Sequence, residues 1–137
     1  MTQKEFISKL LKKNKRATIV GSLGTISKDL LELDNGKNCI IPIKGAMGCA
    51  IGVGLGIALS SKEKVIVVVG DGSYLMKMGS VSTVLEESPK NLKIYILNNN
   101  CYASTGGQLI NFDKSFVPNN WGNNNPRAHK MFEVVRV

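Results

Sequence analysis

The first residues of the chain have the spacing of an amphipathic helix. Their apolar side chains recur at helical intervals, with lysines on the opposite face: Phe6, Ile7, Leu10 and Leu11. Thr2 stands three residues before Glu5, which is the pattern of a capping box at a helix N-terminus. The spacing therefore predicts a helix over residues 3–13.

After this helix, short apolar runs alternate with helical stretches. The run 64–69 is apolar on both faces, as in a central parallel strand. The predicted strands are 17–20, 39–43, 64–69, 93–97 and 131–137. Pro42 either weakens the second of them or places it at a sheet edge. The predicted helices are one capped by Ser27 and ending near Gly36, then 49–59 and 74–87. This alternation predicts an α/β fold with three layers, α/β/α, around a mainly parallel central sheet.

The predicted helix 49–59 is rich in glycine. Gly48, Gly52 and Gly56 share one face, and Gly54 lies off it. Glycine in a helix costs up to about 1 kcal/mol relative to alanine. Three glycines on one face therefore predict the close approach of another helix, a ligand or a partner chain.

Length and composition narrow the class of protein. A chain of 137 residues, 43% of them apolar, predicts one globular domain over 1–137. Without an apolar run of about 18 residues or a signal-like N-terminus, we expect no membrane span and a cytoplasmic location. Cys39, Cys49 and Cys101 are odd in number and widely spaced, which argues against a disulfide framework and a Cys-x-x-Cys metal site.

The net charge of +8 permits several interpretations. Six of the 18 basic residues lie in the first 16 positions, where they fit the solvated face of the first helix. A basic surface for an acidic partner or an anionic substrate is the main alternative. The basic residues have no interleaved aromatic side chains, so we expect no nucleic-acid partner.

Polar or glycine-rich residues follow three of the predicted strands, at 21–25, 70–73 and 98–102. In an open parallel sheet, ligands bind beyond the carboxyl ends of the strands. Asp71 lies between two glycines where a strand gives way to a helix, and an Asn amide follows the next strand. Hard oxygen ligands of this kind suit Mg²⁺ held together with phosphate. From these residues alone, an N-capping Asp in a plain turn remains the alternative.

The same segments resemble a known family. Gly70-Asp71-Gly72, then a helix, then Asn98-Asn99 at the end of the next strand, resembles the signature of thiamine diphosphate-dependent enzymes. Residues 20–31, 44–48 and 102–108 are similar to the cofactor domain of sulfopyruvate and phosphonopyruvate decarboxylases. The resemblance covers residues 17–108 and implies the diphosphate-binding domain of a 2-oxoacid decarboxylase.

The resemblance implies thiamine diphosphate and Mg²⁺ as cofactors. Asp71, the Asn99 side chain and the backbone oxygen of Cys101 would bind the metal, while Gly72 and Ser73 would contact the diphosphate. The implied cofactor-binding residues are Gly24, Thr25, Gly45, Ala46, Met47, Gly70, Asp71, Gly72, Ser73, Asn99, Cys101 and Tyr102.

The pyrimidine side of the cofactor has its own implied contacts. The Gly45 carbonyl would accept a hydrogen bond from the 4′-amino group, and the Met47 N–H would reach the ring. The Met47 side chain would hold the cofactor bent, although ordinary core packing is the alternative for this residue. Gly24 and Thr25 would touch the phosphates.

The family also uses a glutamate that activates the pyrimidine ring, and no acid of this chain matches it. The resemblance therefore implies a pyrimidine-binding, α-type partner subunit that supplies the catalytic glutamate, in a homo- or hetero-oligomer. The implied reaction is decarboxylation of a small anionic 2-oxo acid such as sulfopyruvate or phosphonopyruvate.

Some features leave other functions open. Residues 109–137 form a short, Asn-rich tail that departs from the family pattern. In it, His129 is expected to be a surface or structural residue, and Trp121 is expected to pack within the tail. The alternatives are a β subunit of a 2-oxoacid:ferredoxin oxidoreductase, a non-catalytic cofactor-binding module, and a nucleotide-binding domain that uses Asp71 for Mg²⁺.

Overall fold

The computed structural model describes residues 1–118 and 130–137. The expectations for His129 and Trp121 fall on positions outside these ranges. Five parallel strands form the central sheet in the order β2-β1-β3-β4-β7. Their bounds are β1 Thr18–Gly21, β2 Cys39–Pro42, β3 Val65–Gly70, β4 Leu92–Asn98 and β7 Phe132–Arg136. Of the two alternatives for Pro42, the edge strand is confirmed, because β2 is the outermost strand on its side of the sheet.

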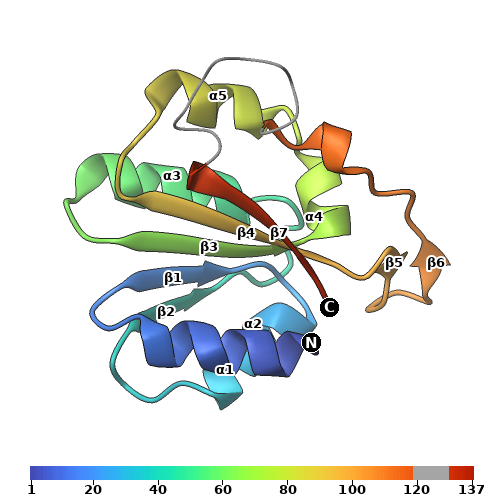
Figure 1. Ribbon diagram of the computed structural model, residues 1–137, viewed down its shortest axis with the longest axis horizontal. Helices are drawn as coiled ribbons and strands as arrows, with labels where there is room; N and C mark the ends of the chain where they lie inside the picture. Colours follow the sequence, from blue (N-terminus) through green and yellow to red (C-terminus); the bar gives the residue numbers. More distant parts are fainter. Residues whose placement is uncertain (119–129) are drawn as a thin grey trace.

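Helices cover both faces of this sheet (Figure 1). One face carries α1 (Gln3–Lys13) and α2 (Thr25–Glu32), and the other carries α3 (Ala50–Ser60), α4 (Asp71–Met76) and α5 (Ser80–Glu87). The predicted three-layer α/β/α fold with a parallel sheet is therefore confirmed. After β4 the chain forms a small hairpin, β5 (Cys101–Tyr102) with β6 (Gln108–Leu109), and a turn of 3₁₀ helix at Lys114–Phe116.

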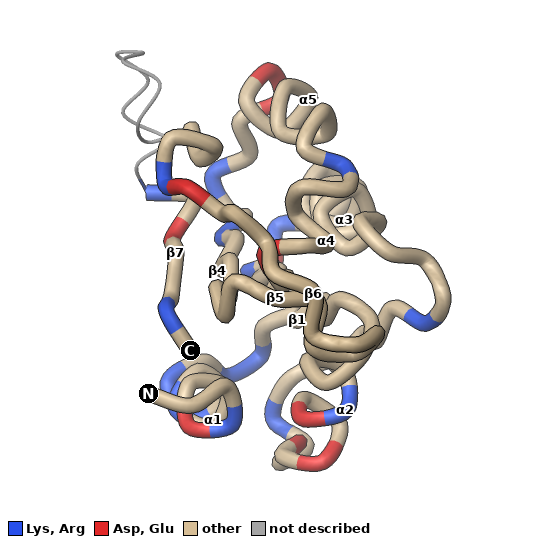
Figure 2. The backbone as a smooth tube through the Cα atoms, turned by 90° about the vertical axis from the view of Figure 1, so that its right-hand side faces the viewer, with Lys and Arg blue, Asp and Glu red and all other residues tan. Residues whose placement is uncertain are grey.

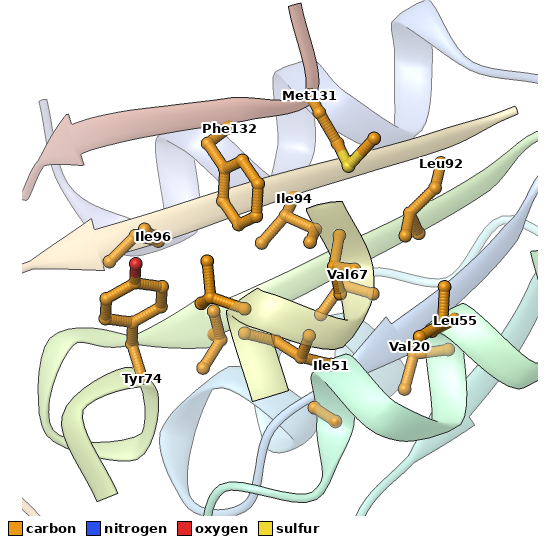
Figure 3. Close-up of a cluster of buried hydrophobic side chains, with 14 of the residues drawn as sticks. Val20, Ile51, Leu55, Val67, Tyr74, Leu92, Ile94, Ile96, Met131 and Phe132 are labelled. Carbon is orange, nitrogen blue, oxygen red and sulfur yellow. The ribbon is translucent and has the colours of Figure 1, made fainter. Parts of the chain in front are cut away.

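Each layer boundary holds an apolar core. The larger cluster lies between the sheet and α3–α5, where Tyr74 and Phe132 are fully buried against Ile94 and Ile96 (Figure 3). The smaller one joins the apolar face of α1 to the opposite side of the sheet. Helix α1 begins at the predicted capping box. In it, the Thr2 hydroxyl accepts from the Glu5 N–H at 3.2 Å, and the Glu5 carboxylate accepts from the Thr2 N–H at 2.8 Å.

The predicted helix 74–87 was wrong, because the chain forms two helices there. The N–H and the hydroxyl of Ser80 both donate to the Lys77 carbonyl, at 2.9 and 2.7 Å. These bonds close a turn after Met76 instead of continuing the helix, and α5 starts afresh after Gly79. The break separates α4, which starts at the carboxyl end of β3, from α5, which leads back to the start of β4.

The predicted bounds of α2 also need correction. Gly24 is its N-cap with φ +85°, and Ser27 lies inside the helix, donating to the carbonyls of Gly21 and Ser22 at 3.0 and 2.7 Å. The helix ends at Glu32, before Gly36, because the side chains of Asp34 and Asn35 accept from backbone N–H groups two residues ahead. In the described part of the chain no helix is long and apolar enough to cross a membrane.

The glycines of α3 differ in their surroundings. A Cβ at Gly54 would lie 2.2 Å from a methyl group of Val67, so this glycine lets the helix approach β3. At Gly52 and Gly56 a Cβ would meet nothing within 4 Å, and both residues are exposed. Close packing on the sheet therefore depends on Gly54, and none of the described residues covers the face formed by Gly52 and Gly56.

Candidate functional site

The three polar strand ends meet at a cleft on the carboxyl edge of the sheet. In the sheet order β2-β1-β3, the strand that follows β1 in sequence lies on one side of it and β3 lies on the other, so the strand order reverses between β1 and β3. In open parallel sheets, ligands bind at the carboxyl ends of the strands where the order reverses. Nine of the predicted cofactor-binding residues line this cleft: Thr25, Met47, Gly70, Asp71, Gly72, Ser73, Asn99, Cys101 and Tyr102.

Asp71 is the buried centre of the site, with only 3% of its surface exposed. Its Oδ1 accepts from the Gly72 N–H at 2.8 Å, and its Oδ2 accepts from the N–H groups of Asn99 and Asn100 at 3.2 and 2.8 Å. A carboxylate offers about four acceptor positions. Three are used here, so Oδ1 retains one acceptor position for a cation, while the backbone bonds fix its orientation.

The turn after β4 brings Asn99 to this carboxylate. The Asn98 side chain accepts from the Asn100 N–H at 3.0 Å, and Asn100 adopts φ +58°. Asn99 is exposed, and its Oδ1 accepts from the Cys101 N–H at 3.0 Å. Asn98 therefore shapes the turn. Asp71 and Asn99 of the signature lie at the ends of the neighbouring strands β3 and β4.

Residues at the end of β1 and the start of α4 complete this side of the cleft. Ser22 lines it and accepts a long hydrogen bond, 3.4 Å, from the Gly70 N–H. Ser73 is buried in the first turn of α4. Gly72 lies directly under the ring of Tyr102, where a Cβ would come within 2.5 Å of a ring carbon. The absence of a side chain at Gly72 allows this contact.

The other three predicted residues lie beside the cleft. Gly24 and Gly45 line a neighbouring pocket together with Lys28 and Lys44. Ala46 forms the turn before α3, where its carbonyl accepts from the Cys49 N–H at 3.2 Å. Met47 is half-buried and lines the main cleft, so the segment 44–48 runs between the two pockets.

Several residues that line the cleft were not among the predicted cofactor-binding residues. Gln3 and Val137 reach the cleft from the start of α1 and from beyond β7, and only tertiary structure brings them there. Ala103, Ser104 and Thr105 also line it, from the turn of the β5–β6 hairpin. Here a signal exists, because Gly106-Gly107 between two short extended runs is typical of a hairpin turn.

The acid–base and metal-binding groups of the site are few. Asp71 is the sole acid among the described lining residues. Within residues 1–118 and 130–137, no three or more His, Cys, Asp or Glu side chains lie close enough together to hold a metal ion. Burial raises the pKa of the Tyr74 hydroxyl, which donates to the Phe116 carbonyl at 2.8 Å and serves packing. The site therefore suits a hard cation that arrives with its own anionic ligand, such as a diphosphate.

Comparison with known proteins identifies the family. The model of the thiamine pyrophosphate enzyme C-terminal, TPP-binding domain matches residues 20–136. The chain belongs to this family. The resemblance carried by the signature residues is thus confirmed, and it supports thiamine diphosphate as the cofactor.

Individual relatives agree with this family. The sulfopyruvate decarboxylase subunit beta of Methanocaldococcus jannaschii is 41% identical over 97 residues, covering 71% of this chain and 51% of that protein. The phosphonopyruvate decarboxylase of Streptomyces hygroscopicus is 46% identical over 92 residues, covering 67% of this chain and 23% of that protein. The chain thus spans about half, or less, of these relatives' length.

A solved structure shares the fold. The 2-oxoglutarate:ferredoxin oxidoreductase from Magnetococcus marinus superposes with a TM-score of 0.58 at 16% identity, covering 79% of this chain and 36% of that one. At this identity the similarity concerns the fold alone.

Proposed function

We propose that this chain binds thiamine diphosphate and Mg²⁺ in the cleft at the carboxyl edge of the sheet. The observation that carries the proposal is the pairing of Asp71 with the Asn99 turn, joined by the hydrogen bonds from Asn99 and Asn100 to the Asp71 carboxylate. The pairing occurs within the residues that match the family model.

The metal would be held by few protein groups. Asp71 offers the free acceptor position of Oδ1. Asn99, an exposed residue, lies at the next strand end, where its Oδ1 accepts from the Cys101 N–H and would also face the metal. The backbone oxygen of Cys101 is the third protein ligand in this proposal. Diphosphate oxygens would complete the shell, as is usual for Mg²⁺.

The organic part of the cofactor would lie along the wall formed by Met47. Gly72 and Ser73 would contact the diphosphate, and Gly24 and Thr25 would flank it. The Gly45 carbonyl and the Met47 N–H would face the pyrimidine ring, with the half-buried Met47 side chain as the wedge that bends the molecule.

We further propose that the chain works as one subunit of a 2-oxoacid decarboxylase for a sulfo- or phosphonopyruvate-like substrate. When bound, the cofactor supplies the electron sink for loss of CO₂. The chain's own residues hold and orient the cofactor. Asp71, the one acid among the described lining residues, is committed to backbone N–H groups, so the glutamate that activates the pyrimidine ring comes from a partner subunit.

Reconstitution tests this division of labour. The chain with thiamine diphosphate, Mg²⁺ and sulfopyruvate should release little CO₂, and adding a pyrimidine-binding subunit should restore turnover. A partner whose activating glutamate is replaced by Gln serves as the matched control and should not restore it. Robust decarboxylation by the chain alone would refute the split site.

Cofactor binding without turnover in the complete mixture would instead support a non-catalytic binding module. Substitution of phosphonopyruvate for sulfopyruvate in the same assay then measures the substrate preference.

A further inference from the structure

A second pocket lies beside the main cleft, beyond the carboxyl ends of β1 and β2. We call it the lysine pocket; its lining comes from residues 23–31 and 43–45, and its volume is about 440 Å³. Leu23 lines both the lysine pocket and the main cleft. Gly24 lines the pocket, while the next residue, Thr25, lines the cleft. The two spaces therefore adjoin at the segment that follows β1.

Cations distinguish the lysine pocket from the main cleft. Lys28 and Lys44 line the pocket, whereas no Lys or Arg occurs among the described residues that line the cleft. Figure 2 views this edge of the molecule and shows cation positions, in blue, on α2 and on the loop that leads to α3. Lys28 belongs to α2 and Lys44 to that loop, so two separate segments each bring one positive charge to the pocket.

Neither ammonium group has an ion-pair partner within the described part of the chain. Lys28 and Lys44 are exposed, and no hydrogen bond or ion pair joins the side chain of either to a described residue. The acids of α2, Asp29 and Glu32, lie 4.0 and 3.0 Å from the Lys4 ammonium instead, and Lys28 attracts Glu32 from beyond ion-pair distance. Both lysines are therefore available to a bound anion.

The walls of the lysine pocket strengthen the attraction between these lysines and an anion. Leu23, Leu31 and Ile43 line it, and Leu31 is 49% exposed in spite of its apolar side chain. Apolar walls displace water, which lowers the local dielectric constant and raises the interaction energy of a charge pair. An anionic group on a short carbon link therefore suits the pocket better than a fully hydrated ion.

The proposed substrates carry such a group. Sulfopyruvate and phosphonopyruvate each have a 2-oxo acid at one end and a sulfonate or phosphonate on a methylene carbon at the other. This second anion needs a cation when it leaves water, and the described lining of the main cleft has no Lys or Arg. Gly45 lines the lysine pocket, and in the proposed function its carbonyl faces the pyrimidine ring. The pocket thus adjoins the proposed site of the reaction.

We propose that Lys28 and Lys44 bind the sulfonate or phosphonate group of the substrate and so select it over a 2-oxo acid that lacks a second anion. This inference rests on the proposed function, which supplies the class of substrate. The two lysines are specificity-determining residues, and other residues of the site hold the cofactor.

Titration of the chain with sulfoacetate tests the anion site without catalysis. Sulfoacetate carries a carboxylate and a sulfonate but no 2-oxo group. In amide NMR spectra without cofactor, it should shift the N–H signals of Gly24, Lys28 and Gly45. Lys28→Met and Lys44→Met should each weaken this binding by roughly tenfold, because each removes a charge-assisted hydrogen bond. Lys37→Met, which removes the same charge at the amino end of β2, is the matched control and should bind like the wild-type chain.

Acetate provides the matched ligand, because it has the carboxylate but no sulfonate. It should bind roughly tenfold more weakly than sulfoacetate, since it makes no charge-assisted contact with the second anion's lysines. Shifts that are absent, that survive both lysine substitutions, or that acetate reproduces at the same concentration would overturn the proposed anion site.

Kinetics in the complete mixture separate this inference from the proposed function. With the pyrimidine-binding subunit, thiamine diphosphate and Mg²⁺ present, Lys28→Met and Lys44→Met should raise KM for sulfopyruvate roughly tenfold and leave kcat within about twofold, because the lost contact is made equally in the ground and transition states. An unchanged KM would overturn the proposal. Weaker subunit association in sedimentation would also overturn it, because the pocket would then be a docking surface for the partner. Absence of turnover by the wild-type mixture would instead overturn the proposed function, and the sulfoacetate titration would still decide the anion site.

Discussion

At the scale of single residues, Asp71 serves the fold as well as the proposed metal site. Its buried carboxylate joins the start of α4 to the turn after β4 through three backbone N–H groups. These bonds would thereby orient the proposed metal ligand before any metal binds. The same bonds mean that a change at Asp71 affects stability and cofactor binding together.

Asp71→Ala should therefore lower the free energy of unfolding by about 1–3 kcal/mol without any cofactor, because one buried and two part-buried N–H groups lose their acceptor. Urea unfolding measures this change. Asp34→Ala, at an exposed acid with one backbone partner, should shift stability by no more than about 0.5 kcal/mol. Equal stability of Asp71→Ala and the wild-type chain would contradict the structural role.

At the scale of elements, the glycines of α3 and of the turn before it differ in their surroundings. Gly48, Gly52 and Gly56 share a face, for which the spacing predicted a close approach. At Gly48 a Cβ would lie 2.8 Å from a side-chain carbon of Lys77, whereas Gly52 and Gly56 face open space. Yet Gly54, off that face, is the glycine that meets the sheet at Val67. Helical spacing shows which residues share a face, but the strand that a face meets depends on the tertiary arrangement.

Alanine substitutions in α3 separate these two roles. Gly54→Ala should destabilise the chain by about 1–3 kcal/mol, because its methyl group overlaps Val67. Gly56→Ala should stabilise the isolated chain by about 0.5–1 kcal/mol through helix propensity alone. Both effects are measured as shifts in the urea midpoint of unfolding. Stabilisation by Gly54→Ala together with destabilisation by Gly56→Ala would contradict the packing of Gly54 against the sheet.

Elements governed by local chemistry were predictable. The capping box at Thr2 and Glu5 and the apolar run of β3 correctly gave α1 and a central strand. The break after Met76 was missed because the spacing of apolar residues stays helical through residues 77–79. The hydrogen bonds from Ser80 to the Lys77 carbonyl form a turn there, and this turn ends the helix. The hairpin β5–β6 was missed although Gly106-Gly107 marks its turn.

At the scale of the whole molecule, the sheet order assembles the site. The segments that end β1, β3 and β4 were separately visible as polar strand ends, and the parallel register brings them to one edge. Gln3 and Val137 join the same cleft without any motif, since only the packing of α1 and β7 brings them there. The meeting of these motif segments was therefore predictable, whereas the outer wall of the cleft was not.

The distribution of acids in the cleft also belongs to this scale. Asp71 is the one acid in the described lining of the cleft, so the proposed function assigns it to the metal–diphosphate and takes the acid for the pyrimidine ring from a partner subunit. The relatives named as beta subunits fit this division, and the chain spans about half of their length.

Calorimetric titration of the chain with thiamine diphosphate tests the central claim most directly. With Mg²⁺ present, the wild-type chain should bind the cofactor at one site, and removal of Mg²⁺ by a chelator should abolish most of the affinity. Asp71→Asn, which keeps the size of the side chain but loses its charge, should weaken binding by roughly tenfold or more. Binding that is indifferent to Mg²⁺ and unchanged in Asp71→Asn would contradict the account.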